Sequence, residues 1–129
     1  MHYDIRAVEA DHTEALQAHF DRHRAESGRG DIHFMPFAPD DRNGPRGLNT
    51  DGLALPLSEP AWQRWFAAWS GNEVVGHVNL KGGQLKSTLH RCELGIGIER
   101  QARGQGLGRA LMLRAIEYVR AVPGLDWLD

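Results

Sequence analysis

The sequence of 129 residues contains a single cysteine, Cys92, so no disulfide can form within the chain, as is usual in a reducing compartment. No stretch reaches the roughly 20 apolar residues of a membrane span. The first residues, MHYDIRAVEADH, hold acids where a secretion signal has its apolar centre. The formal net charge of -2 provides no general positive field for nucleic acid. These absences predict a cytoplasmic protein that binds neither membrane nor nucleic acid.

The spacing of apolar residues predicts a single α/β domain. Alternation over residues 3–7 indicates a first strand, and a helical pattern follows over residues 11–27. Two further strands are predicted over residues 74–80 and 89–98. A second helix begins at Gly106, where apolar residues recur every fourth position.

Residues 60–69 are rich in aromatic side chains at helical spacing, although the end of this segment could pass into a strand. Because few basic residues interleave with them, these aromatics are interpreted as core and not as a surface for stacking bases. They are Trp62, Trp65, Phe66 and Trp69.

Residues 28–60 are rich in glycine and proline and cannot hold long regular elements. The segment carries five acids against three arginines, and Asp40 and Asp41 are adjacent. It is either a solvated connection or a lid over a cationic substrate, because long loops inside small domains are often functional. On the second interpretation Asp40 and Asp41 would bind the substrate.

The segment GIGIERQARGQGLGRAL, residues 95–111, has five glycines within fourteen residues and precedes the second helix. A helix N-terminus presents unpaired N–H groups and a partial positive charge, and glycines in front of it allow an anion to approach the backbone. Residues 99–120 hold five arginines against two glutamates. A phosphate site is therefore predicted at this loop.

Two common phosphate motifs fit the loop poorly. A nucleoside triphosphate loop needs Lys and then Ser or Thr after its last glycine, whereas Arg109 follows Gly108 here. A dinucleotide fingerprint needs a third small residue where Arg109 stands, and its first glycine should directly follow the strand. Asp126 lies where the ribose-binding acid would be expected, so a dinucleotide-binding fragment stays open as an alternative.

The run Arg103-Gly104-Gln105-Gly106-Leu107-Gly108 matches the pattern R/Q-x-x-G-x-G/A of the GNAT family of N-acetyltransferases. The longer segment ELGIGIERQARGQGLGRALMLRAIEYV resembles the fourth strand, pyrophosphate loop and following helix of that family, and EVVGHVNL resembles its third strand. This resemblance implies a mixed, mainly antiparallel central sheet flanked by helices, of the acyl-CoA N-acyltransferase type and truncated after the helix that follows the glycine loop.

The resemblance implies acetyl-CoA as co-substrate, and no metal. Its pyrophosphate would lie on the backbone of the glycine loop, and its amide-rich pantetheine arm would pair like a strand with residues 96–98. Gly95 and Gly97 would leave room for this approach. The expected cofactor-binding residues are Ile96, Gly97, Ile98, Arg103, Gly104, Gln105, Gly106, Leu107, Gly108 and Arg109.

The implied reaction is attack of an amine on the acetyl thioester, and the amine must first lose a proton because its pKa is about 10.4. Glu93 is the candidate general base, since it lies on the fourth predicted strand, on the face opposite Cys92. His77 and His90 are alternatives with suitable ordinary pKa values. Cys92 is interpreted as a core residue and not as a nucleophile.

His19 and His23 lie four residues apart on the first predicted helix, a spacing that would suit a pair of metal ligands. No carboxylate or cysteine completes a metal site at a recognisable spacing. Solvated or core-edge histidines are therefore the simpler interpretation.

Other functions remain open beside acetyl transfer to an amine on a small molecule or protein. A CoA-binding or CoA-sensing module without turnover could keep the loop and lack the catalytic groups. Residues 125–128 read as the start of a further strand, while the family pattern continues with more strands. Residues 1–129 are thus expected to be one domain without its C-terminal strands, either a fragment or a homodimer through an open sheet edge.

Overall fold

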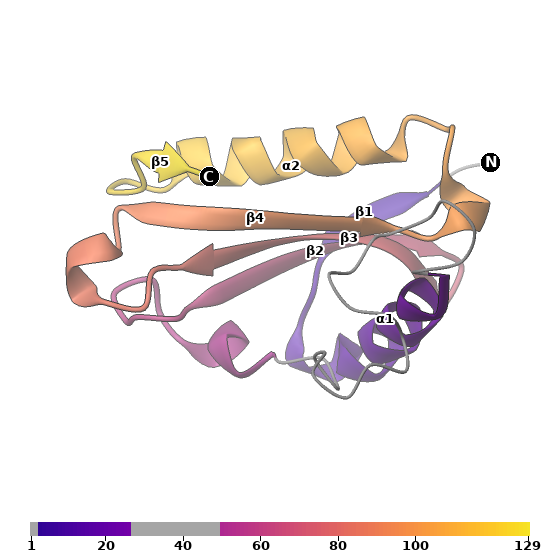
Figure 1. Ribbon diagram of the computed structural model, residues 1–129, viewed down its shortest axis with the longest axis horizontal. Helices are drawn as coiled ribbons and strands as arrows, with labels where there is room; N and C mark the ends of the chain where they lie inside the picture. Colours follow the sequence, from indigo (N-terminus) through magenta and orange to yellow (C-terminus); the bar gives the residue numbers. More distant parts are fainter. Residues whose placement is uncertain (1–2, 27–49) are drawn as a thin grey trace.

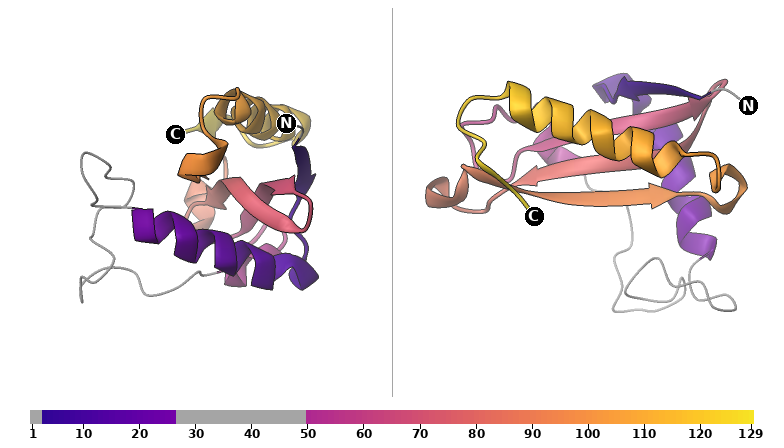
Figure 2. Two further views of the ribbon diagram at one scale, coloured as in Figure 1. Left: turned by 90° about the vertical axis from the view of Figure 1, so that its right-hand side faces the viewer. Right: turned by 90° about the horizontal axis from the view of Figure 1, so that it is seen from above.

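A computed structural model describes residues 3–26 and 50–129, and two helices lie on opposite faces of its central sheet (Figure 1, Figure 2). Five strands follow the order β1-β2-β3-β4-β5. The first four strands pair antiparallel, and β5 pairs parallel with β4. The predicted class, a mixed and mainly antiparallel sheet flanked by helices, is confirmed. The strands are β1 Asp4–Ala7, β2 Gln63–Ser70, β3 Glu73–Gly82, β4 Arg91–Ile98 and β5 Trp127–Leu128.

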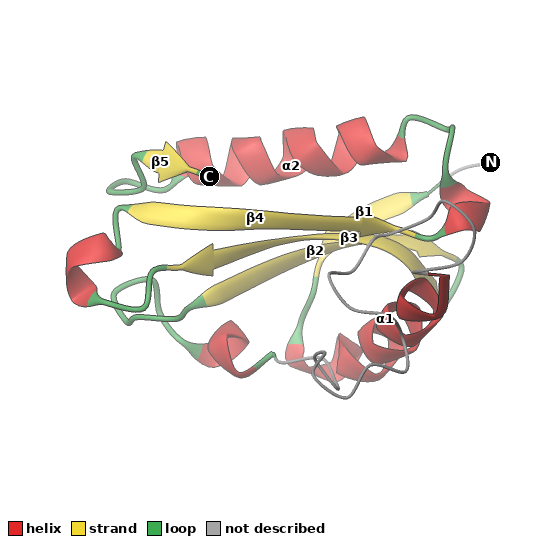
Figure 3. Ribbon diagram, viewed as in Figure 1, coloured by secondary structure: helices red, strands yellow, loops and turns green. Residues whose placement is uncertain are grey.

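The two long helices are α1, Thr13–Glu26, and α2, Leu107–Ala121, as the helical spacing predicts (Figure 3). The described residues also form short 3-10 turns between the longer elements: η1 Ala10–His12, η2 Asp51–Ala54, η3 Lys86–Thr88 and η4 Arg100–Ala102. Within residues 3–26 and 50–129, no helix has the length and apolar character that crossing a bilayer requires.

The prediction of a helix over residues 60–69 is wrong, because Gln63–Ser70 form strand β2. Trp65, Ala67 and Trp69 pack on the α1 side of the sheet, whereas Phe66 and Ala68 pack on the α2 side. Both faces of the strand are buried, so polar residues do not alternate along it and its period is hidden. The prediction that the aromatic residues belong to the core is confirmed.

The two faces of the sheet are built differently. Towards α2, an apolar cluster joins Val78 and Leu80 of β3 to Leu111 and Ala115 of the helix. Towards α1, a smaller apolar cluster around Leu16 adjoins buried histidines. The buried histidines and Glu99 thus lie on the α1 face of the sheet.

Candidate active site

The glycine loop joins β4 to α2 through the turn η4 (Figure 1). Gly104 and Gly106 have φ of +75° and +77°, a left-handed conformation that residues with a Cβ rarely adopt. Gly108 has a different reason, because a Cβ there would lie 3.2 Å from Ile98 Cδ1. The first two glycines shape the turn, and the third lets α2 approach β4.

The N-terminus of α2 is open to solvent and has neither a side-chain cap nor an acidic residue in its first turn. Residues Arg103 to Gly106 in front of it are exposed. The first N–H groups of a helix have no acceptor within the helix. The backbone here can therefore receive an anion, as the sequence predicts.

One edge of β4 is paired over only part of its length. Strand β5 pairs with Arg91 and Cys92, and the Asp129 carbonyl accepts the N–H of Leu94 at 2.9 Å. In the described part of the chain, no strand pairs with this edge along residues 95–98. Alternate N–H groups of a strand point the same way, so Ile96 presents its N–H on the same side as Leu94. Another extended backbone can pair at this edge.

A cavity of about 250 Å³ lies where the open edge, the glycine loop and the end of α1 meet, and it is lined by His23, Ile96, Gly97, Ile98 and Arg103. Arg103 reaches back from the loop, and its Nε and Nη2 donate to the Ile98 carbonyl at 3.2 and 3.1 Å. The structure thus brings four of the predicted cofactor-binding residues together with a histidine of α1.

The space over Gly95 and Gly97 is filled by neighbouring side chains. A Cβ on Gly95 would lie 2.6 Å from Asn79 Oδ1, and a Cβ on Gly97 would lie 2.7 Å from His77 Cε1 and 2.9 Å from His23 Nε2. These glycines accommodate polar side chains on the α1 face of the sheet. The expectation that glycine stands at these positions to leave room for pantetheine is therefore not supported. A pantetheine arm would pair with the edge of the strand instead.

A buried hydrogen-bonded network connects α1 to β3 and to the end of β4. Nδ1–H of His19 donates to Glu99 Oε2 at 2.7 Å, and His19 Nε2 shares a 2.8 Å hydrogen bond with His77 Nδ1. Arg22 donates from Nε to Glu99 Oε1 and from Nη2 to the Val74 carbonyl, both at 2.8 Å. Each buried charge therefore has a partner of opposite sign or a backbone acceptor.

Burial and charge set the protonation of this network. Burial, assisted by the neighbouring His19 and His23, lowers the pKa of His77 to about 3. Burial alone would raise the pKa of Glu99, but hydrogen bonds from His19 and Arg22 hold that pKa below its ordinary value. His77 is neutral and Glu99 is ionised at neutral pH.

Glu93, the predicted base, is exposed on β4 opposite Lys81 and lines a separate cavity of about 320 Å³. Alternation along the strand places it on the same face as Gly97, four residues away. His90 is exposed just before β4 begins. Cys92 is buried in the apolar cluster under α2, and burial raises the pKa of its thiol. This burial agrees with its interpretation as a core residue.

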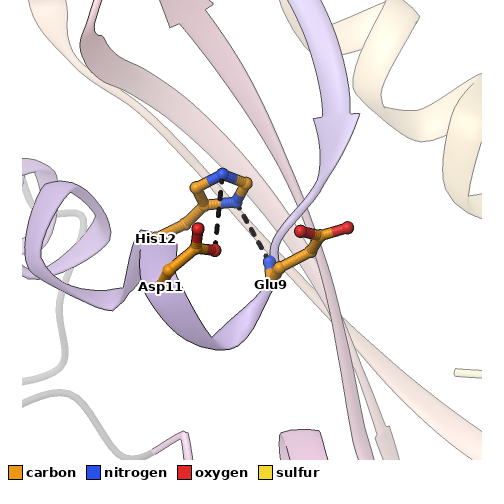
Figure 4. A group of neighbouring side chains, drawn as sticks. All are labelled: Glu9, Asp11 and His12. Carbon is orange, nitrogen blue, oxygen red and sulfur yellow. Dashed lines mark hydrogen bonds and ion pairs between the residues drawn. The ribbon is translucent and has the colours of Figure 1, made fainter.

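Two groups of potential metal ligands make contacts within the protein. Glu99 and His77 occupy both ring nitrogens of His19. His19 therefore has no ring nitrogen left to bind a metal ion together with His23. Glu9, Asp11 and His12 do gather at η1 (Figure 4). There His12 Nδ1 accepts the N–H of Glu9 at 3.1 Å, a contact that caps the turn. The carboxylates are exposed, so this group reads as a helix start.

Sequence reasoning missed Arg22, Glu26 and Glu99 as members of the site. Arg22 and Glu26 belong to α1, whereas Glu99 follows β4, so only the packing of α1 on the sheet brings them into one region. A signal was present, since His77 interrupts an apolar strand next to Val75 and Val78. The predicted acceptor residues Asp40 and Asp41 lie outside the described residues.

Several solved structures share this fold. An acetyltransferase of the GNAT family from Streptococcus pneumoniae superposes with a TM-score of 0.72 at 23% identity, covering 93% of this chain and 68% of that one. The GNAT domain of S. lividans PAT has a TM-score of 0.65 at 16% identity, covering 92% and 65%. For yncA from Salmonella typhimurium, solved with its cofactor acetyl-CoA, the TM-score is 0.63 at 16% identity, covering 93% and 64%. The chain therefore spans about two thirds of each.

The sheet and the glycine loop have the architecture of acyltransferases. The model of the acetyltransferase (GNAT) family matches residues 38–128, so the chain belongs to that family. The predicted family is confirmed. The alternative of a dinucleotide-binding fragment is therefore rejected. Among curated proteins, none matches this chain.

Proposed function

We propose that this chain transfers the acetyl group of acetyl-CoA to an amine. The observation that carries the proposal is the meeting of the open edge of β4 with Arg103 of the glycine loop at one cavity, three residues before the uncapped start of α2 at Gly106. Coenzyme A has the matching order of groups, a pyrophosphate followed by an amide-rich arm that ends in the thioester. One of the similar structures described above, that of yncA, was solved with acetyl-CoA.

In this proposal the backbone of residues 104–109 holds the pyrophosphate. Both the helix N-terminus and the arginines at Arg103 and Arg109 favour a dianionic ligand there. The pantetheine amides pair with the edge at Ile96 and Ile98, which leads the thioester along β4. The single cysteine, which is buried, supports a location in the reducing cytoplasm.

The chemistry begins with loss of a proton from the ammonium form of the acceptor. The amine nitrogen then attacks the thioester carbonyl, the C–S bond breaks, and the thiolate takes up a proton. Glu93 is the proposed base, and it acts through water because it is exposed and lies four residues from Gly97.

The acceptor is proposed to be cationic, because Asp40 and Asp41 belong to an acid-rich segment. Replacing both by Asn should raise the KM for the amine several-fold and leave the KM for acetyl-CoA unchanged. Steady-state kinetics in which each substrate is varied in turn distinguish the two. Unchanged kinetics with every active amine would remove this part of the proposal.

The decisive binding experiment is calorimetry of coenzyme A with Gly106→Val. A side chain at this positive-φ position displaces the backbone from the phosphate, and loss of one charge-assisted hydrogen bond already weakens binding about tenfold. Gly71→Val is the matched control, since Gly71 has φ of +62° in the turn between β2 and β3. Binding by Gly106→Val as tight as that by the parent would overturn the loop assignment.

A CoA-binding module without turnover is separated from a transferase by a product assay. The parent is mixed with acetyl-CoA and a panel of spermidine, a lysine peptide and a peptide with a free N-terminus. Mass spectrometry should show a gain of one acetyl group on at least one of them. Saturable CoA binding with no acetylated amine would favour the module.

A further inference from the structure

We propose that a cavity at the β1 edge of the sheet, the β1-edge cavity, binds a small carboxylic acid with an aromatic body. The cavity has a volume of about 460 Å³, and none of the described residues that line it also lines the cavity at the open edge of β4. The strand order β1-β2-β3-β4-β5 places the two cavities at opposite sides of the sheet. This second site is additional to the one proposed for acetyl-CoA and does not depend on it.

The β1-edge cavity forms because β1 is shorter than β2. Strand β1 pairs with β2 only as far as Ala7 opposite Phe66, and the Val8 N–H then donates to the Trp65 carbonyl at 2.8 Å. After this contact the chain leaves the sheet to reach η1 and α1 (Figure 1). Within the described residues, no strand pairs with the first residues of β2 on this side. The start of β2 therefore lies open beside the chain that leaves it.

The walls of the β1-edge cavity are largely apolar and come from both faces of the sheet. Trp65 packs on the α1 face and Phe66 on the α2 face, and both line the cavity. Val8, just after β1, and Leu53 of η2 add aliphatic surface. The volume lies within the roughly 300 to 1,000 Å³ of small-molecule sites. Because two of the walls are aromatic, an aromatic ring can make offset or edge-to-face contacts with them.

Arg114 of α2 brings a cation to this apolar cavity. Its guanidinium carbon lies 4.5 Å from the centroid of the Phe66 ring, and both residues line the cavity. A guanidinium that lies over an aromatic ring keeps N–H groups along its edges for hydrogen bonds. Arg114 forms no ion pair with a carboxylate among the described residues. The carboxylate of a ligand can therefore pair with it, in the two-pronged geometry that arginine favours.

Arg64 of β2 adds a second positive charge, which is held in place. Its Nη1 donates to the Gln63 carbonyl at 2.6 Å and its Nη2 to the Leu55 carbonyl at 2.9 Å. Both acceptors are neutral, so within the described part of the chain this charge has no carboxylate partner. Of the described residues that line the cavity, only Glu9 has a carboxylate, and it is exposed to water. The lining therefore has a surplus of positive charge.

Tyr118 provides a hydroxyl next to this charge. It follows Arg114 by four residues on α2, so the two side chains lie on the same face of the helix. Its ring contacts Phe66 with centroids 5.6 Å apart, and its hydroxyl has no hydrogen-bond partner among the described residues. An O–H group and a guanidinium can bind one carboxylate together. A neutral ligand would leave the arginine charges unpaired and a cationic ligand would be repelled, so the cavity selects an acid.

The first test titrates the isotopically labelled protein with phenylacetate and follows its amide NMR signals. The signals of Val8 and Leu53 should shift and saturate with a Kd of about 0.1 to 1 mM, an affinity that a ligand of this size can reach. The signals of Gly97 and Arg103, at the other cavity, should not move. Phenylacetamide has the same shape without the charge, and it should bind at least about tenfold more weakly.

The second test repeats the phenylacetate titration with Arg114→Gln. We expect the affinity to fall at least about tenfold, because the charge-assisted pair is lost. Arg120→Gln is the matched control, since Arg120 is an exposed arginine of the same helix that does not line the cavity. Its affinity should stay within about twofold of the parent.

Several results would overturn the carboxylate site. One is the absence of saturable shifts with phenylacetate up to about 10 mM. Equal binding of phenylacetate and phenylacetamide is another, and so is an unchanged affinity in Arg114→Gln. Shifts at Gly97 and Arg103 in place of Val8 and Leu53 would assign the acid to the glycine loop instead. If circular dichroism shows that Arg114→Gln does not fold, the preference of the parent for the acid over the amide at Val8 and Leu53 decides.

Discussion

The two faces of the central sheet use opposite physical means to bury their interior. The α2 face joins aliphatic and aromatic side chains to Leu107, Leu111 and Ala115. The α1 face buries three histidines and Glu99 beside its smaller apolar cluster. Apolar burial stabilises a fold directly, whereas buried charges need partners merely to offset their lost hydration.

This contrast supports the proposal that the chemistry takes place on the α1 face of the sheet. A protein that needed only stability would gain little from placing His19, His77 and Glu99 between a helix and a sheet. The His77 ring at the end of this network packs against Gly97, which lines the cavity at the open edge of β4. The α2 face holds that strand and the glycine loop in place, and the α1 face presents titratable groups to it.

The largest expected change in the free energy of unfolding comes from removing a buried side chain on the α2 face. Leu111→Ala removes a fully buried side chain from the middle of α2 and should lower the free energy of unfolding by about 3 kcal/mol, because it leaves a cavity. Urea denaturation measures the change. Leu113→Ala, on the same helix but 54% exposed, should change it by less than about 0.5 kcal/mol. Equal effects of the two variants would contradict the packing described for this face.

A smaller loss is expected from the polar face. Glu99→Gln keeps the shape of the side chain but removes the charge that holds His19 and Arg22, and we expect a loss of about 2 kcal/mol. The same urea denaturation applies. Because Arg22 is partly exposed, water can solvate its released guanidinium, which limits the effect. A stability equal to that of the parent would show that the network contributes nothing to the fold.

A third prediction extends the comparison of the two faces to the effect of pH on stability. The folded pKa of His77, about 3, lies below its ordinary value of 6.5, so the unfolded chain binds more protons between these values. Stability should therefore be constant above pH 6.5 and fall as pH decreases through this window, by at most about 1.4 kcal/mol per pH unit for one group.

His77→Asn should make that pH dependence shallower, whatever its effect on stability at neutral pH. Thermal denaturation at pH 7, 6 and 5 measures the slope for both proteins. A parallel slope in the parent and the variant would show that His77 does not titrate as described. The residual slope in His77→Asn would belong to other groups, among them His23, whose pKa is also lowered.

The glycine loop could be predicted from sequence because its information is local. Gly104 and Gly106 are two residues apart, a helical pattern begins directly after them, and the helix N-terminus follows from backbone geometry alone. The open edge of β4 was inferred from the family resemblance only. Its position along residues 95–98 depends on where β5 stops pairing, which local spacing does not encode.

The buried network could not be predicted for the opposite reason. His19, Arg22, His77 and Glu99 come from three separate parts of the chain, and no spacing connects them. Their partnership depends on how α1 crosses the sheet. The same dependence on tertiary structure explains why β2 was predicted as a helix. Helices cover both faces of this strand, so apolar and polar residues do not alternate along it.

The order of strands in the sheet has a consequence for how the chain folds. Strands β2, β3 and β4 are consecutive neighbours with short connections, so the loss of chain entropy on closing their loops is small. Strand β1 must pair with β2 across the whole segment that contains α1. We therefore expect the β2–β3–β4 meander to form early and α1 to dock late. Because His19, Arg22 and His23 arrive with α1, the chain acquires its titratable site only in the last step of folding.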